Sequence, residues 1–233
     1  MADPNIELLT QVAEALGDLR ERLVLVGGCA TALLITDPAA APVRATEDVD
    51  AIIAVVSKPA YHDLGEALRA KGFSQPLEEG DPPYRWTFEG LKLDVMPINP
   101  DVLGFSNRWH ELALQTAFTA TLREGLSIRH VSSTCFVATK LVAFLDRGDG
   151  DYLMSHDLED ALSVVDGRPE LVEELGRAES ELREYVADVF ARLLADEGFL
   201  NALPGLVIEG SPADRSPAVL QRLHAIAQMK RNA

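Results

Sequence analysis

Two aspartates placed two residues apart in an apolar run constrain this chain more than any other feature. Asp48 and Asp50 open the run from 48 to 56, which is typical of a buried strand. Side chains alternate between the two faces of a strand, so both carboxylates point to the same side. Two like charges buried side by side cost on the order of several kcal/mol unless cations or hydrogen bonds compensate them. A divalent metal ion is the usual compensation, and the same-face spacing of roughly 6.5 to 7 Å suits magnesium.

A third carboxylate comes from a second predicted strand. Asp94 lies in the segment from Lys92 to Met96, between Leu93 and Val95, which require burial. Three acids within apolar strands are harder to explain as structural residues than one. We therefore expect a magnesium site made by Asp48, Asp50 and Asp94.

A glycine pair follows the apolar strand that precedes these acids. Gly27 and Gly28 end the run from Leu23 to Val26 and open a short alternation of small and apolar residues. The backbone N–H groups at such a strand-turn-helix junction suit a phosphate, and glycine removes the side chain that would block close approach. The alternative for this pair alone is an ordinary tight turn.

The order of these pieces resembles the nucleotidyltransferase superfamily, in which a phosphate cradle, two alternating aspartates and a further aspartate hold magnesium and a nucleoside triphosphate. Three further patterns narrow the resemblance: R-x-T-x-D-x-D from Arg44 to Asp50, K-x6-R from Lys140 to Arg147, and D-x2-D formed by Asp157 and Asp160. Together they resemble the AbiEii-type nucleotidyltransferase toxins of bacterial type IV toxin–antitoxin systems, including the MenT toxins that modify tRNA. The resemblance covers about residues 20 to 170.

The resemblance implies a magnesium-dependent enzyme that transfers a nucleoside monophosphate from an NTP to an acceptor. Gly27, Gly28 and Thr46 would contact the nucleotide. Many relatives carry serine where this chain has Gly28, so any hydroxyl contact to phosphate is lost while the backbone contacts remain. Asp94 would be either a further metal ligand or the general base for the acceptor, and both alternatives stay open.

A predicted helix carries the second half of the resemblance. Lys140 and Arg147 are seven residues apart, about two helical turns or roughly 10 Å along one face. Lys140 would neutralise triphosphate charge, and Asp157 would orient the acceptor or position Lys140. Without the resemblance, Lys140 and Asp157 would be an ordinary surface ion pair worth at most about 1 kcal/mol.

The net charge of −16, from 21 basic and 37 acidic residues, disfavours a protein that grips long nucleic acid. A local basic funnel near the catalytic half could still serve RNA. Its candidate residues are Lys92, Arg108, Arg123, Arg129, Lys140 and Arg147.

The resemblance makes a tRNA end the first choice of acceptor, with a toxin role and a cognate antitoxin protein as partner. A small cationic acceptor similar to an aminoglycoside, or a protein hydroxyl, is the alternative that the acidic charge favours. A hypothesis from a different class is a non-catalytic protein that binds nucleotide or a partner.

Hydrophobic periodicity predicts a mixed α+β chain. Helices are expected over residues 6–20, 29–36, 59–70, 108–117, 133–146 and 156–165, with more helices in 170–200 and 217–230. Strands are expected over 23–26, 48–56, 84–89, 91–96 and 126–131. The predicted fold is a nucleotidyltransferase fold, with a small mixed sheet and a C-terminal helical bundle. We expect a catalytic domain over 1–131 and a helical domain over 132–233 that contributes Lys140 and Asp157 to the cleft.

Cys29 and Cys135 have no C-x2-C partner and are expected to be buried thiols. No stretch approaches the roughly 18 apolar residues of a membrane span. The start of the chain lacks the basic and apolar regions of a secretion signal, so we expect a cytoplasmic protein.

Overall fold

The computed structural model describes residues 3–55, 57–76, 80–147, 151–208 and 215–229. The chain forms two compact units: unit 1 comprises residues 1–33 and 45–132, and unit 2 comprises residues 34–44 and 133–233. The sequence-based boundary near residue 131 assigned segment 34–44 to the first domain. The structure groups that segment with the C-terminal helices instead.

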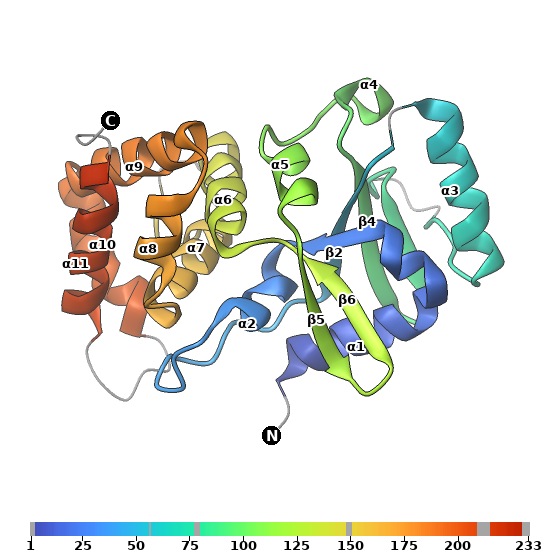
Figure 1. The fold of residues 1–233 in the computed structure, drawn as a ribbon, viewed down its shortest axis with the longest axis horizontal. Helices are drawn as coiled ribbons and strands as arrows, with labels where there is room; N and C mark the ends of the chain where they lie inside the picture. Colours follow the sequence, from blue (N-terminus) through green and yellow to red (C-terminus); the bar gives the residue numbers. More distant parts are fainter. Residues whose placement is uncertain (1–2, 56, 77–79, 148–150, 209–214, 230–233) are drawn as a thin grey trace. The chain divides into compact units, whose positions relative to one another are not determined.

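Unit 1 is built on a six-stranded mixed sheet with the strand order β3-β4-β2-β1-β6-β5 (Figure 1). Strand β2 pairs in parallel with β4, and β1 pairs in parallel with β6, while the other pairs are antiparallel. The strands are β1 (Leu23–Val26), β2 (Asp48–Ile53), β3 (Arg85–Phe88), β4 (Leu91–Pro97), β5 (Phe118–Arg123) and β6 (Leu126–His130).

Helices and turns precede these strands or connect them. They are α1 (Pro4–Leu16), η1 (Gly17–Arg22), η2 (Gly28–Ala30), α2 (Thr31–Leu34), α3 (Lys58–Ala70), α4 (Pro100–Leu103) and α5 (His110–Gln115). Asp3 caps α1 by accepting from the backbone N–H groups of Asn5 and Ile6, and Ser57 caps α3 by accepting from Ala60. Helix α2 stands where the chain leaves unit 1.

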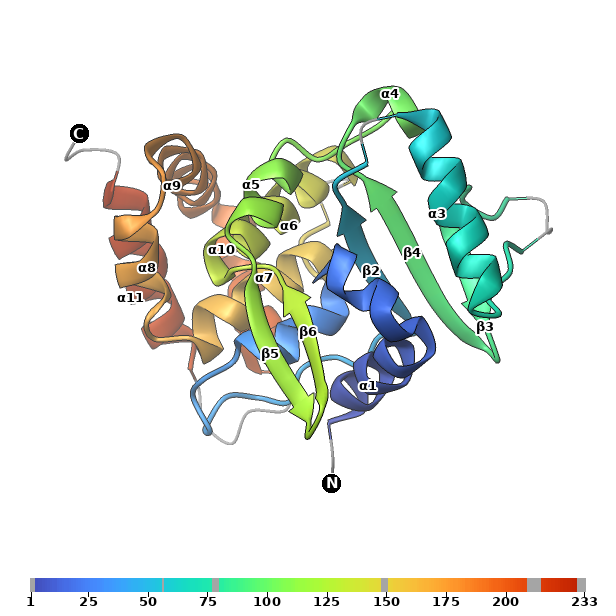
Figure 2. The same cartoon turned by 45° about the vertical axis from the view of Figure 1, so that its right-hand side comes forward.

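The core of unit 1 lies on one face of the sheet, under α1 and α3 (Figure 2). Leu9 of α1 and Leu64 of α3 belong to one buried cluster with Val49 and Ala51 of β2 and Leu93 of β4. Because side chains alternate along a strand, the residues between these core positions point to the opposite face. The acidic residues of β2 and β4 therefore lie on the face away from α1 and α3.

Unit 2 is helical. Its main helices are α6 (Ser133–Arg147), α7 (His156–Gly167), α8 (Leu171–Arg177), α9 (Ser180–Leu194), α10 (Glu197–Ile208) and α11 (Ser216–Ala227). Segment 34–44 is held at the end of α7, because the carbonyl of Gly167 accepts from the N–H groups of Thr36 and Asp37, at 2.9 Å each. A Cβ at Gly167 would come within 2.6 Å of the Ile35 side chain, so glycine permits this close packing.

Most predicted elements are confirmed. The strand at 23–26, the helix from Pro59 to Ala70 and the hairpin around Gly90 all form, and Ser155 caps α7 as expected. The predicted helix over 29–36 is a 3₁₀ turn followed by one turn of helix, and the strand predicted over 48–56 ends at Ile53. Strand β5 was not predicted. None of its side chains is buried: exposed residues alternate with half-exposed ones, so the strand lacks the pattern of a half-buried strand. The loops predicted at 78–83, 148–151 and 210–212 lie wholly or partly outside the described residues.

Cys29 and Cys135 are buried free thiols, as predicted. Among the helices that the structure describes, none combines the length and apolar character needed to cross a membrane.

The buried His110 at the start of α5 predicts an acid-sensitive fold. Burial lowers the pKa of His110 from 6.5 to about 4. Between these two pH values the imidazole is protonated in the unfolded chain but stays neutral in the folded chain. The stability from His110 is therefore fully present above pH 6.5 and is lost as the pH falls toward 4. We expect the His110 contribution to fall by about 2 kcal/mol between about pH 7.5 and about pH 5.

Urea unfolding of His110→Gln at both pH values checks this expectation. The variant should lose less stability on acidification than the wild type, whatever its stability at neutral pH. The control is His62→Gln, which changes an exposed histidine on α3. Equal acid sensitivity in His110→Gln and wild type would show that other groups set the pH dependence.

Candidate active site

A row of charged side chains crosses three adjacent strands of unit 1. In the parallel pair β2 and β4, Asp50 lies opposite Asp94, and in the antiparallel pair β3 and β4, Arg85 lies opposite Asp94. Residues paired across neighbouring strands point to the same face. Asp48 precedes Asp50 by two residues and shares that face. The structure thus confirms that Asp48 and Asp50 share one face, and it places Asp94 and Arg85 on the same face.

Arg85 binds two of the three carboxylates. Its Nε and Nη2 donate to the two oxygens of Asp94, at 2.8 Å each, and Nη2 also donates to Oδ2 of Asp48 at 3.0 Å. Asp94 is almost fully buried, with a side chain 6% exposed, whereas the Asp48 side chain is 37% exposed. The guanidinium therefore compensates a buried charge with a paired contact and reaches the more exposed charge with a single hydrogen bond.

Two neighbours of Asp94 have shifted pKa values. The hydrogen bonds from Arg85 to Asp94 raise the pKa of the guanidinium above its ordinary value. Tyr61 of α3 donates its hydroxyl to the carbonyl of Val95, and burial followed by the charge of Asp94 raises the pKa of Tyr61 to about 12. Both shifts are expected beside a negative charge with little water to screen it.

Gly27 makes room for Asp50. The residue has a φ of +71°, and a Cβ added there would stand 1.9 Å from Oδ2 of Asp50. The close approach that we expected for a phosphate is thus made, in this structure, by a carboxylate of the chain itself. Gly28 is buried and opens the turn η2. The role of Gly27 and Gly28 in binding a nucleotide stays a prediction.

Thr46 anchors the entry to β2. Its N–H donates to Oδ1 of the buried Asn5 at 3.0 Å, and its hydroxyl lies 3.3 Å from the carbonyl of Asp48. Asn5 stands in the first turn of α1. These contacts fix the backbone immediately before the paired aspartates, which gives Thr46 a positioning role independent of any nucleotide.

The donor set fits a divalent ion in its chemistry. Asp48 and Asp50 supply carboxylate oxygens on one face, and a single cationic nitrogen of Arg85 already reaches both Asp48 and Asp94. Among the described residues, however, no group of three or more His, Cys, Asp or Glu side chains is arranged to hold a metal ion. The magnesium site of Asp48, Asp50 and Asp94 therefore stays a prediction, and in this structure Asp94 is bound to Arg85.

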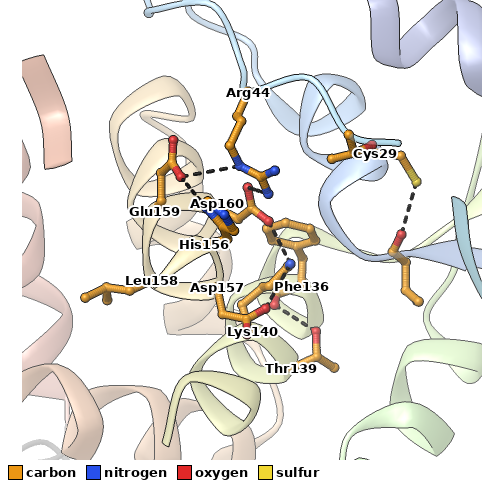
Figure 3. Close-up of polar contacts among 12 residues, drawn as sticks. Cys29, Arg44, Phe136, Thr139, Lys140, His156, Asp157, Leu158, Glu159 and Asp160 are labelled. Carbon is orange, nitrogen blue, oxygen red and sulfur yellow. Dashed lines mark hydrogen bonds and ion pairs between the residues drawn. The ribbon is translucent and has the colours of Figure 1, made fainter. Parts of the chain in front are cut away.

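A second charged cluster lies within unit 2 (Figure 3). Lys140 of α6 contacts Asp157 Oδ1 at 3.1 Å and Asp160 Oδ2 at 2.7 Å, both on α7. Arg147 pairs with the other oxygen of Asp157 at 2.8 Å. Arg44 lies 3.6 Å from Asp160 and 3.4 Å from Glu159. The charged residues of the K-x6-R and D-x2-D patterns thus form ion pairs with each other. Arg44, in segment 34–44, contacts two acids of α7.

Lys140 is a largely covered ion-pair residue rather than an exposed charge. Its side chain is 12% exposed and that of Asp160 is 2% exposed. The contact between Asp157 and Lys140 favours the expectation that Asp157 positions Lys140 over the alternative that it orients an acceptor. The parts of Lys140, Arg147 and Asp157 in binding a nucleotide stay predictions.

The other residues of the predicted basic funnel also have contacts within the chain. Lys92 pairs with Glu47, Arg123 pairs with Glu14, Arg129 donates to the carbonyl of Leu114, and Arg108 lies over the ring of Trp109. Each of these cations is at least partly occupied by a neighbour.

Sequence reasoning missed Arg85, although a signal was present. The two-residue turn Glu89–Gly90, in which both residues have a positive φ, sets the register of the hairpin. Counting back from that turn places Arg85 opposite Asp94. Asn5 was missed as well, and no local pattern distinguishes it from other polar residues in a first helical turn.

No protein-family model and no curated protein matches this chain. Among solved structures, it is similar to an antigenic nucleotidyltransferase-like protein from Paracoccidioides brasiliensis, with 22% identity and a TM-score of 0.53 over 86% of this chain and 94% of the other. It is also similar to a candidate nucleotidyltransferase from H. pylori, with 15% identity and a TM-score of 0.50 over 97% and 93% of the two chains.

A third structure, of the antibiotic-resistance factor ANT(2'')-Ia, has 16% identity and a TM-score of 0.48 over 84% and 96% of the two chains. The first two likenesses show that this chain has a nucleotidyltransferase-like fold, which confirms the predicted fold class.

Gly27→Ala tests the contact between Gly27 and Asp50. We expect a loss of at least about 2 kcal/mol in the free energy of unfolding, since a methyl group adds overpacking to the strain of a positive φ. The control is Gly90→Ala, because Gly90 has a φ of +87° with nothing within 4 Å of its added Cβ. Combining Gly27→Ala with Asp50→Ala should recover part of the loss, and simple additivity of the two changes would contradict the contact.

Lys140→Ala tests the cluster in unit 2. Removing Lys140 leaves the buried Asp160 with only the longer contact to Arg44 at 3.6 Å, so the variant should lose about 2 to 3 kcal/mol of stability. Lys92→Ala, which removes an exposed pair with Glu47, should cost about 1 kcal/mol or less. Chemical denaturation of both variants measures the difference, and equal losses would show that Lys140 is only a surface charge. Adding Asp160→Asn to Lys140→Ala should reduce the loss.

Proposed function

We propose that this protein is a nucleotidyltransferase that transfers a nucleoside monophosphate from an NTP to a hydroxyl acceptor, with magnesium as cofactor. The single observation that supports this most is the register of β2 and β4, which aligns Asp50 with Asp94 while Asp48 shares their face. The nucleotidyltransferase-like fold supports the same reaction class. A purely structural role would not require so many carboxylates on one face of the sheet.

In the proposed reaction, the acceptor hydroxyl gives up its proton to solvent and its oxygen forms a bond to the α-phosphorus. The bond between the α-phosphorus and the bridging oxygen breaks, and pyrophosphate leaves with that oxygen. A divalent ion held by Asp48 and Asp50 would neutralise charge on the phosphates as that bond breaks. Thr46 and Asn5 fix the start of β2, and Gly27 fixes the space in which the Asp50 carboxylate lies. The chain thereby holds its two candidate metal ligands before any ligand arrives, which reduces reorganisation during the reaction.

The finer assignment follows the resemblance to AbiEii-type toxins. We propose a tRNA end as acceptor, a toxin role within a type IV toxin–antitoxin system, and an antitoxin protein as partner. The motifs that support it are the R-x-T-x-D-x-D, K-x6-R and D-x2-D patterns, whose charged residues contact each other in unit 2 or lie on the acidic face of unit 1.

A small cationic acceptor is the second candidate, and the charge of the chain favours it. The net charge of −16 attracts cations at long range and repels a phosphate backbone. The basic residues of the predicted funnel are already in contact with acids, carbonyls or an aromatic ring. Binding an RNA through them would require these contacts to be broken or shared.

Incubation with each of the four α-labelled NTPs, magnesium and either total RNA, protein extract or aminoglycosides tests the function and the acceptor together. We expect label in one acceptor class and its loss when magnesium is chelated. Asp50→Asn should remove most of the transfer, about a hundredfold or more, because it deletes a charge that would hold the ion. Asp48→Asn should behave in the same way.

The matched control is Asp63→Asn, which removes an acidic charge from an exposed position on α3 and should leave transfer unchanged. Undiminished transfer by a folded Asp50→Asn protein would refute the assignment of the site. Label in RNA supports the tRNA proposal, whereas label only in aminoglycosides supports the second candidate. Labelled nucleotide that is bound but never transferred would identify a non-catalytic binding protein.

A further inference from the structure

Arg85 contacts a carboxylate oxygen that a metal ion would also need. Nη2 of Arg85 is 3.0 Å from Asp48 Oδ2, an oxygen that the proposed function assigns to magnesium. A guanidinium and a divalent ion cannot both occupy the same lone-pair region of one carboxylate oxygen. An ion that binds through this oxygen must therefore displace the contact from Arg85.

Arg85 is held unequally by its two partners. Two parallel hydrogen bonds of 2.8 Å join it to the buried Asp94, while one bond of 3.0 Å joins it to the partly exposed Asp48. Bidentate pairs with a buried carboxylate are stronger and geometrically more restrictive than single contacts near solvent. The Asp48 contact is thus the one that can be given up, and Asp94 keeps the guanidinium beside the site when it is.

We propose that Arg85 is a regulatory counter-cation that occupies Asp48 until a divalent ion displaces it, and that Asp94 is the positioning residue that anchors Arg85 rather than a metal ligand. This inference rests on the proposed metal-dependent function and extends it to residues outside the predicted motifs. The consequence is a site whose affinity for metal is lowered, because binding must break one charge-assisted hydrogen bond.

Both oxygens of Asp94 accept hydrogen bonds from Arg85, which supports the role of Asp94 as the anchor of Arg85. The geometry also explains why three carboxylates on one face do not converge as a metal group among the described residues. Asp48 and Asp50 belong to β2, whereas Asp94 is bound toward β3, where Arg85 begins the strand.

Binding of Mn²⁺ in place of magnesium, measured by calorimetry and by thermal shift without turnover, tests the inference. Arg85→Gln should bind Mn²⁺ at least about tenfold more tightly than the wild type, as expected from the removal of one charge-assisted hydrogen bond. The variant should be less stable without metal, and Mn²⁺ should raise its melting temperature more than that of the wild type. Asp50→Asn should weaken the binding, which places the ion at this site.

Arg123→Gln is the matched control, because it removes the same charge and an ion pair from the edge strand β5. Its Mn²⁺ affinity should equal that of the wild type. Arg85→Lys covers the case in which Arg85→Gln does not fold, since lysine keeps the charge but cannot make two parallel bonds to Asp94 while reaching Asp48. Its affinity should rise in the same direction by a smaller factor.

The outcomes separate the inference from the function on which it rests. Equal or weaker Mn²⁺ binding by the Arg85 variants, with normal binding by the wild type, would overturn the counter-cation role and leave the metal site standing. If the wild type and all variants fail to bind Mn²⁺, both alone and with an NTP present, the metal site and the inference fail together. An equal rise in affinity for Arg123→Gln would show only a general charge effect and would also overturn the inference.

Discussion

Carboxylates gathered on one face of a sheet need a cation, and a guanidinium of the chain supplies it in this protein. Arg85 reaches Asp94 and Asp48 because β3, β4 and β2 are paired in one register. A slip of either pairing by one residue would turn the acids toward α1 and α3, where the face is apolar. The charge cluster and the hydrophobic core therefore specify the same strand register from opposite faces of the sheet.

In unit 2 as well, cations of the chain compensate acidic side chains, here between helices rather than strands. Lys140 is half-buried and contacts two carboxylates of α7, and Arg44 approaches Asp160 from segment 34–44. In both units, motif residues that a ligand would be expected to neutralise are already neutralised by the chain. A ligand that uses them must compete with internal partners, so recognition demands geometry as well as charge, because a diffuse counter-ion cannot replace a fixed pair.

The sequence predicts the elements of this fold better than their associations. Periodicity and capping residues such as Ser155 locate most helices and strands, and the alternation of Asp48 and Asp50 correctly predicts a shared face. The grouping of segment 34–44 with unit 2 depends on the close contact between Ile35 and Gly167, which are far apart in the chain and carry no local pattern. Likewise, the alternation of side chains along a strand predicts which face of the sheet carries the carboxylates, but it does not predict that Arg85 binds them.

For the proposed transfer, the charge of the chain bears on the choice of acceptor more than the fold does. A net charge of −16 works against a long phosphate backbone, and the cations of the predicted funnel already have partners, as Lys92 has Glu47 and Arg123 has Glu14. An RNA acceptor would have to draw these cations away from their acids, and the energy lost there would offset what the new phosphate contacts contribute. A cationic acceptor is attracted by the net charge at long range, although it too would have to share carboxylates such as Asp48 and Glu47 with the cations that already bind them. For the transfer that we propose, the charges around Asp48 and Asp50 therefore distinguish the two candidate acceptors, whereas the fold does not.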